Sequence, residues 1–185
     1  EGIRRLRGMF AYALWDRERQ TLLLIRDRLG IKPLYYRLQS DGGIVFASEL
    51  PALLGAMPSV SLDPGAVARY LTRLYIPGPK TIFEQVRELR PGELLRIKHG
   101  RVESRQYFQL ASAWLQARGT GGDALRGTRD ELDERFRWRL RDTVQAHLVS
   151  DVPLGLFLSG GLDSGSILAM MRAVTNGPIR SFSIG

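Results

Sequence analysis

Short runs of apolar residues separated by polar turns fill the first half of the chain, and this pattern predicts strands joined as β-hairpins. Apolar runs at residues 8–15 and 21–25 flank the charged residues 16–19. Two more runs, at 34–38 and 44–47, are separated by a turn that contains two glycines. Because successive hairpin strands pair with one another, we expect an antiparallel β-meander over this part of the chain.

A further hairpin and a helix are predicted before residue 110. The runs 94–98 and 102–108 flank a glycine-containing turn, which is typical of a hairpin. Asp63 followed by Pro64 has the pattern of a helix start, with an N-cap aspartate and proline in the first helical position. The first part of the chain therefore combines antiparallel strands with short helices.

The regular pattern fades between residues 111 and 127, where glycine is densest, and we interpret this segment as an interdomain linker. Thr128 and Glu131 then have the spacing of a capping box. Apolar residues follow at intervals of four, which predicts one face of a helix of about 20 residues. These residues are Leu132, Phe136, Leu140, Val144 and Leu148.

The stretch 154–164 has a different organisation: an apolar run, a glycine-containing turn and the start of a helix. Residues 154–158 are short enough for a buried parallel strand, and apolar residues within 164–173 predict a helix. A second strand is predicted at 179–184, after a turn that contains a Gly-Pro pair. Strand, helix and strand in this order predict a parallel βαβ unit with a right-handed crossover.

The turn between that strand and helix is suited to an anion. A strand that enters a helix through a glycine-rich turn directs several backbone N–H groups, and the positive end of the helix dipole, at one point. Gly160 and Gly161 allow an oxyanion to approach the backbone, and the hydroxyls of Ser159 and Ser164 can donate hydrogen bonds to it. A carboxylate repels phosphate, so the role expected for Asp163 is to hold a Mg²⁺ ion that bridges to the phosphates.

Residues 159–164 read S-G-G-L-D-S, which matches the signature of the PP-loop ATP pyrophosphatases at every fixed position. The stretch has neither the G-x-x-x-x-G-K-[ST] pattern of a Walker A loop nor a G-x-G-x-x-G pattern. The alternative is an ordinary strand–turn–helix junction in which the serines and the aspartate are helix caps.

Charge and composition narrow the classes of partner. The net charge is +8, but the arginines are spread along the chain and the densest group, at 135–141, covers several sides of a helix. We therefore interpret them as a solvated surface and expect no nucleic-acid partner. Two distant histidines and no cysteine form no metal-ligand cluster and no disulfide. Neither a membrane-spanning run nor a signal segment is present, so we expect a cytoplasmic protein without a membrane partner.

Several segments resemble the glutamine-hydrolysing asparagine synthetases. The run S-D-V-P at 150–153, the loop that follows it and the strand at 181–185 resemble the start of the synthetase domain of that family. Segments in the first part resemble the second half of its class II glutaminase domain, which has an N-terminal nucleophile. These segments are 6–11, 26–36 and 47–49, and residues 63–79 and 90–92 resemble the longer bacterial members.

The resemblance implies an α/β fold, α+β overall, in two domains. Residues 1–110 would be the C-terminal part of an antiparallel-sheet Ntn glutaminase domain, 111–127 the linker, and 128–185 the first βαβ unit of a parallel-sheet PP-loop synthetase domain. The implied ATP- and pyrophosphate-binding residues are Leu158, Ser159, Gly160, Gly161, Asp163, Ser164 and Ile184, with Asp163 meeting Mg²⁺ through the pyrophosphate.

None of the glutaminase residues of the family carries over, because its nucleophile is an N-terminal cysteine and this chain has no cysteine. Asp27, Arg28 and Glu49 are interpreted as turn and packing residues. The chain resembles an internal part of a longer enzyme, and we expect it to be inactive alone in both half-reactions.

The function implied is that of a carbon–nitrogen ligase with glutamine as amido donor. Glutamine would be hydrolysed to ammonia, ATP would convert aspartate to an acyl-adenylate with release of pyrophosphate, and ammonia would displace AMP to give asparagine. The substrates would be glutamine, aspartate and ATP, with Mg²⁺ as cofactor and a homodimer as a candidate assembly. The alternatives are a related amidotransferase, such as a β-lactam synthetase relative with another carboxylate acceptor, and a non-catalytic interaction domain.

Overall fold

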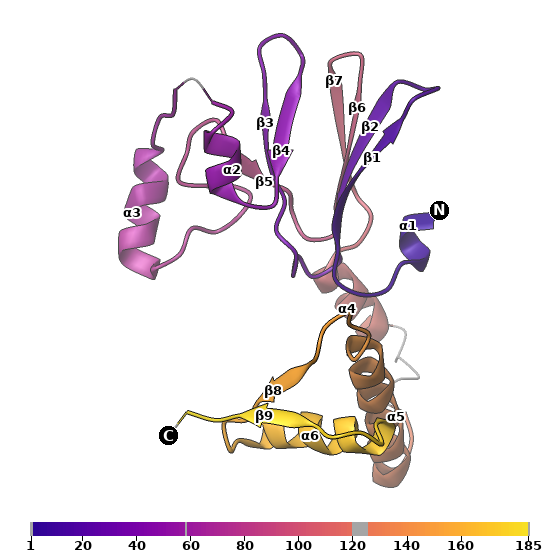
Figure 1. Ribbon diagram of the computed structural model, residues 1–185. Coiled ribbons are helices and arrows are strands. Elements are labelled where there is room, and N and C mark those ends of the chain that lie inside the picture. The colour runs from indigo at the N-terminus through magenta and orange to yellow at the C-terminus, as the bar shows by residue number, and fades with distance from the viewer. Residues whose placement is uncertain (1, 58, 120–125, 185) are drawn as a thin grey trace. The chain divides into compact units, whose positions relative to one another are not determined.

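The computed structural model describes residues 2–57, 59–119 and 126–184. They fall into two compact units, Glu1–Leu115 and Gln116–Gly185, which we describe separately (Figure 1). The helices are α1 Gly2–Arg5, α2 Leu50–Leu54, α3 Pro64–Arg73, α4 Leu110–Gly119, α5 Arg129–His147 and α6 Leu162–Val174. The strands are β1 Ala11–Asp16, β2 Thr21–Arg26, β3 Tyr35–Leu38, β4 Ile44–Ala47, β5 Arg87–Glu88, β6 Glu93–Lys98, β7 Arg101–Gln106, β8 Gly155–Phe157 and β9 Arg180–Phe182.

The first unit contains two antiparallel sheets. One has the strand order β1-β2-β6-β7 and the other the order β4-β3-β5 (Figure 1). The three predicted hairpins, β1–β2, β3–β4 and β6–β7, are confirmed.

The predicted four-strand meander is wrong, because β2 pairs with β6 and not with β3. The connection from β2 to β3 contains Gly30, with a φ of +68°, and Pro33, and it is longer than a tight hairpin loop. Strand β2 is buried over most of its length. Its second edge is paired with β6, a strand from much later in the chain.

The core of the first unit is formed by side chains from both sheets. Leu24 of β2 and Leu95 and Ile97 of β6 pack with Leu34 and Leu89, which flank the second sheet. Strand β6 buries alternate residues, as expected for a strand with one face toward a core. Each of these buried side chains contributes about 1.5–3 kcal/mol relative to exposure.

Helix α3 begins as the sequence predicts. The Asp63 carboxylate accepts a hydrogen bond from the Ala66 N–H at 3.0 Å, and Pro64 is the first helical residue. Helix α4 was not predicted. Its apolar residues Leu110, Trp114 and Leu115 are all exposed, so the helix has no buried apolar face that a sequence pattern could indicate.

Helix α4 occupies the first part of the segment interpreted as a linker. Residues 120–125 of that segment lie outside the described ranges. The proposed domain limits at 110 and 127 stay a prediction.

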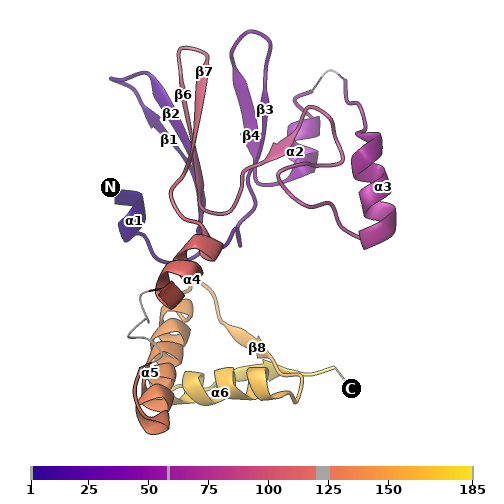
Figure 2. The ribbon, with the colours of Figure 1, turned by 180° about the vertical axis from the view of Figure 1, so that it is seen from behind.

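The second unit contains the parallel βαβ arrangement expected from the sequence. Strands β8 and β9 pair in parallel, and α6 connects them and lies along one face of the pair (Figures 1 and 2). Helix α5 starts with the predicted capping box, in which Thr128 and Glu131 each accept a hydrogen bond from the other's backbone N–H.

The strand that leads to the loop is not buried, contrary to the sequence interpretation. Phe157 is 79% exposed, and its partner Phe182 is 57% exposed. The described sheet has only two strands, and α6 covers only one face of it. Among the helices of the described ranges, none combines the length and apolar character needed to span a bilayer.

Candidate functional site

The loop between β8 and α6 has the shape of an open turn over a helix N-terminus. Gly160 has a φ of +75°, a value that non-glycine residues rarely adopt. Gly161 is the N-cap residue of α6, and no side chain caps this helix. The capping role that the alternative gave to the serines and the aspartate is therefore wrong, while nucleotide binding at this junction stays a prediction. The N–H groups of the first turn of α6 face a position where an acceptor can bind.

The two serines of the loop lie together. Their Oγ atoms are 3.1 Å apart, the Ser159 N–H donates to Ser164 Oγ at 3.3 Å, and the Ser164 hydroxyl is 3.2 Å from the Gly161 carbonyl oxygen. These contacts join the start of the turn to the first turn of α6. They place two hydroxyl groups that can donate hydrogen bonds at the mouth of the loop.

Space is available above the backbone of this turn. A Cβ atom built on Gly160 meets no heavy atom within 4 Å, and one built on Gly161 meets only Ser159 Oγ, at 3.4 Å. The missing side chains therefore leave open space over this part of the turn. The anion cradle stays a prediction, for which this geometry leaves room.

Asp163 lies in the first turn of α6 and is exposed. A carboxylate at this end of a helix is stabilised by the helix dipole. Within the described ranges no group of three acidic or histidine side chains could hold a metal ion, so a Mg²⁺ ion here would need oxygens from phosphate and water besides Asp163.

Leu158 and Ile184, the residues predicted to bind the nucleotide through their backbone, lie at the same end of the β8–β9 pair. The Leu158 N–H donates to the Phe182 carbonyl at 2.8 Å, which extends the β8–β9 pairing up to the turn. Ile184 follows β9, and its side chain is 98% exposed. In parallel sheets, ligands bind at the carboxyl ends of the strands, and both segments end there.

Ser183 is a residue that sequence reasoning missed. Its hydroxyl donates to the Leu158 carbonyl at 2.7 Å and fixes the residue that enters the turn. The only indication of its role in the sequence is its position next to Ile184. Gly155 is a second residue that sequence reasoning missed. A side chain at this position would collide with the ring of Phe182 on the paired strand.

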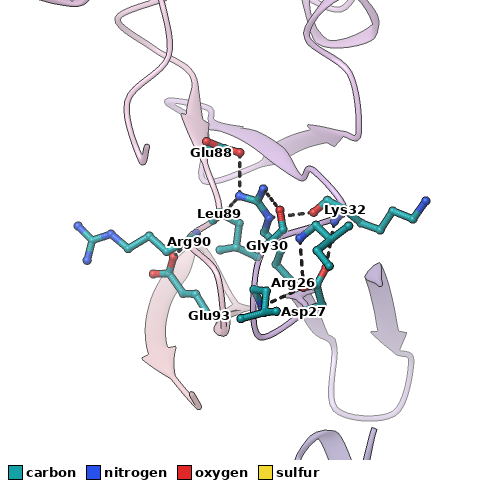
Figure 3. Close-up of polar contacts among 10 residues, drawn as sticks. Arg26, Asp27, Gly30, Lys32, Glu88, Leu89, Arg90 and Glu93 are labelled. Carbon is teal, nitrogen blue, oxygen red and sulfur yellow. Dashed lines mark hydrogen bonds and ion pairs between the residues drawn. The ribbon is translucent and has the colours of Figure 1, made fainter. Parts of the chain in front are cut away.

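In the first unit, the most elaborate polar arrangement surrounds Arg26 (Figure 3). Its guanidinium is almost completely buried and donates to the carbonyl oxygens of Lys32 at 2.8 Å, Gly30 at 2.7 Å and Leu89 at 2.5 Å. It also forms a 2.8 Å ion pair with Glu88. Arg26 thus joins β2 of the first sheet to β5 of the second.

The neighbouring Asp27 is 1% exposed. Its carboxylate accepts hydrogen bonds from the backbone N–H groups of Leu29, Ile31, Lys32 and Phe10, at 3.0 to 3.3 Å. Burial raises the pKa of Asp27, but the four hydrogen bonds together outweigh it, so the pKa lies below its usual value. The prediction that Asp27 is a turn and packing residue agrees with this geometry.

Comparison with known families assigns the two parts of the chain. The family described as "Glutamine amidotransferase domain" matches residues 1–108, and the family described as "Asparagine synthase" matches residues 135–185. The second match contains the whole loop between β8 and α6.

Individual relatives agree with both matches. Asparagine synthetase [glutamine-hydrolyzing] 1 of Bacillus subtilis is 33% identical over 100% of this chain and 28% of its own length. Asparagine synthetase [glutamine-hydrolyzing] 3 of the same organism is 31% identical over 97% of this chain and 28% of its own length. Amidase chry2 of Gibberella zeae is 36% identical over 91% of this chain and 24% of its own length.

The chain thus spans less than a third of the length of each of these relatives. Its antiparallel first unit and parallel second unit follow the order of the two family matches. The chain belongs to the glutamine amidotransferase domain family, and its amidotransferase domain is followed by the start of an asparagine synthase domain.

Proposed function

We propose that the complete protein uses ATP and the amide nitrogen of glutamine to convert a carboxylate to an amide, with aspartate as the acceptor and asparagine as the product. The observation that carries this proposal is the S-G-G-L-D-S loop, open above Gly160, at the start of the asparagine synthase match. The glutamine amidotransferase match before it supports glutamine as the donor. The first unit would be the C-terminal part of an Ntn glutaminase domain, and the second the first βαβ unit of a PP-loop domain.

The residues of the loop would hold the triphosphate of ATP. The N–H groups at the start of α6 and the hydroxyls of Ser159 and Ser164 would donate to phosphate oxygens, and Leu158 and Ile184 would lie beside the nucleotide through their backbone. Asp163, in the first turn of α6, would hold a Mg²⁺ ion, which would neutralise charge on the leaving pyrophosphate.

The energetic task of the loop is to stabilise charge on pyrophosphate as the acceptor carboxylate attacks the α-phosphorus of ATP. Donors that are already in place do this without reorganisation at the moment of reaction. Ammonia would then attack the activated carbonyl carbon, and AMP would leave.

The test is exchange of labelled pyrophosphate into ATP by the full-length protein. We expect exchange that depends on aspartate and on Mg²⁺, with other carboxylates less effective. Binding of ATP without exchange in the presence of any carboxylate would contradict the proposed reaction and leave only nucleotide binding.

A pair of glycine variants separates the loop from general effects on folding. Gly160→Val fills the open space and is strained at positive φ, so ATP affinity should fall by at least about 100-fold. In Gly177→Ala, the added Cβ meets only a methyl group at 3.9 Å, and affinity should not change. Wild-type affinity in Gly160→Val, measured by calorimetry, would rule out the loop as the phosphate site.

A second acceptor is supported by one comparison. The match to amidase chry2 covers 91% of this chain at 36% identity, which is higher than the 33% and 31% identity to the two asparagine synthetases of Bacillus subtilis. We therefore keep, as the second candidate, an amide-forming enzyme that acts on a carboxylate other than aspartate. Exchange that is stimulated by other carboxylates and not by aspartate would favour it.

A further inference from the structure

The first unit contains a cavity of about 640 Å³ that the proposed function leaves unexplained. Its walls come from the loop after β2, from residues 88–91 next to β5, and from the segment that leads into α4. Its volume is in the range of small-molecule sites, which are about 300–1,000 Å³. All of its lining residues belong to the first unit.

Three arginines, Arg26, Arg28 and Arg90, are among the residues that line this cavity. The charge of Arg26 is balanced by the ion pair with Glu88, which also lines the cavity. Arg28 and Arg90 form no salt bridge within the described residues. Two of the arginines that line the cavity thus have no acidic partner among the described residues.

Arg28 is held in place by groups that do not neutralise it. Its Nη1 and Nη2 atoms donate to the backbone carbonyl oxygens of Leu6 at 2.9 Å and Arg4 at 2.7 Å. Its guanidinium carbon lies 5.8 Å from the ring centre of Phe108, another lining residue. A fixed cation beside an aromatic ring is a preorganised feature for recognising an anion.

Arg90 and Gln109 supply donors that are free to turn toward a ligand. The Arg90 side chain extends away from the Arg26 guanidinium (Figure 3). Within the described residues the Arg90 guanidinium donates no hydrogen bond. The Gln109 Oε1 atom accepts from the Ser112 hydroxyl at 2.9 Å, which leaves the amide N–H₂ group of Gln109 as a donor.

We propose that this cavity is a binding site for a small organic phosphate monoester. The phosphate, with a charge of about −1.5 to −2 on one group, matches the two unpaired arginines. Guanidinium groups bind phosphate through paired N–H donors. The organic part of the ligand would contact the apolar walls, which include Leu29, Phe108 and Leu110.

The test is calorimetric titration of the full-length protein with phenyl phosphate. We expect saturable binding with a Kd at or below about 1 mM, and at least tenfold weaker binding of phenol and of inorganic phosphate. Inorganic phosphate that binds as tightly as phenyl phosphate would overturn the proposal, because the apolar walls would then contribute nothing. No saturation up to about 10 mM phenyl phosphate would also overturn it.

Matched charge variants locate the site. Arg90→Gln should weaken phenyl phosphate binding about tenfold, the loss of one charged hydrogen-bonding group, and Arg90→Lys should restore part of it. Arg101→Gln removes the same charge from the exposed edge strand β7, outside the cavity, and should have no effect. Equal effects of Arg90→Gln and Arg101→Gln would show that only net charge matters and would overturn the assignment.

The proposal is independent of the nucleotide loop. Gly160→Val should weaken ATP binding at least about 100-fold but leave phenyl phosphate binding unchanged, because the cavity lies in the first unit. If Gly160→Val also removed phenyl phosphate binding, the ligand would be bound at the loop and the cavity site would be refuted.

Discussion

Asp27 illustrates how a single buried charge can organise a loop. Its two carboxylate oxygens accept hydrogen bonds from two backbone N–H groups each; three of these donors lie in the turn after β2, and the fourth, Phe10, precedes β1. Hydrogen bonds to a buried charged group contribute about 1.5–3 kcal/mol each, more than neutral ones. The loop therefore keeps its conformation although it contains no helix or strand.

Replacing Asp27 with asparagine should destabilise the protein by about 3 kcal/mol. The amide has only one acceptor oxygen, and its N–H₂ group would face two backbone donors. The free energy of unfolding in urea is the measurement. Asp41→Asn, at an exposed turn where the carboxylate accepts from the Gly43 N–H, is the control and should cost less than about 1 kcal/mol. Equal losses in the two variants would contradict this account of Asp27.

The lowered pKa of Asp27 gives stability a definite dependence on pH. A carboxyl whose pKa is lower in the folded state stabilises the fold above its unfolded pKa of about 3.9, and this stabilisation is lost as the pH falls through the folded pKa. We expect the free energy of unfolding to fall below about pH 4 and to fall less steeply in Asp27→Asn. The same pH dependence in both proteins would show that other carboxyl groups are responsible.

At the site, residue types were easier to predict than their contacts. The sequence motif identifies Ser159, Gly160 and Ser164, and the structure brings the two serines together. Ser183 could not be found in this way, because its contact with Leu158 depends on the pairing of two strands whose partner residues are 25 positions apart in the sequence. Such a contact exists only after β8 and β9 have formed.

At the scale of elements, local signals were reliable and distant pairing was not. Hairpins are set by neighbouring residues, so β1–β2, β3–β4 and β6–β7 could be predicted. The pairing of β2 with β6 joins residues such as Leu24 and Leu95, and no local pattern encodes it. Helix α4 escaped prediction for the opposite reason, since its apolar residues are not gathered on a buried face.

The turn that leads into β6 allows a test of element geometry. Gly92 has a φ of +67°, and a Cβ there would lie 2.3 Å from the carbonyl oxygen of Phe108. Gly92→Ala should therefore cost about 3 kcal/mol or more, from backbone strain and from collision with backbone atoms.

Gly100→Ala is the matched control for this turn. Gly100 has a φ of +72°, but a Cβ there would meet only an ordinary contact at 3.7 Å, so the cost should be about 1 kcal/mol. The difference between the two variants, measured by chemical denaturation, isolates the collision with Phe108. Equal costs would mean that backbone strain alone accounts for both.

At the scale of the whole molecule, the order of the two units could be predicted, because antiparallel hairpins precede a strand–helix–strand pattern in the sequence. The exposure of Phe157 and Phe182 could not. A short apolar run indicates burial on both faces only when further elements cover the sheet, and the described part of the second unit supplies α6 on one face.

The contacts of Arg26 have a consequence for how the first unit opens. Its guanidinium belongs to one sheet and its partners at Leu89 and Glu88 to the other, so separating the sheets would expose an unpaired buried charge. We expect hydrogen–deuterium exchange at the Leu89 and Gly92 amides only through global unfolding, whereas the tips near Gly42 and Gly100 exchange early. Protection factors that were equal at the tips and at this junction would show that the two sheets do not open as one cooperative unit.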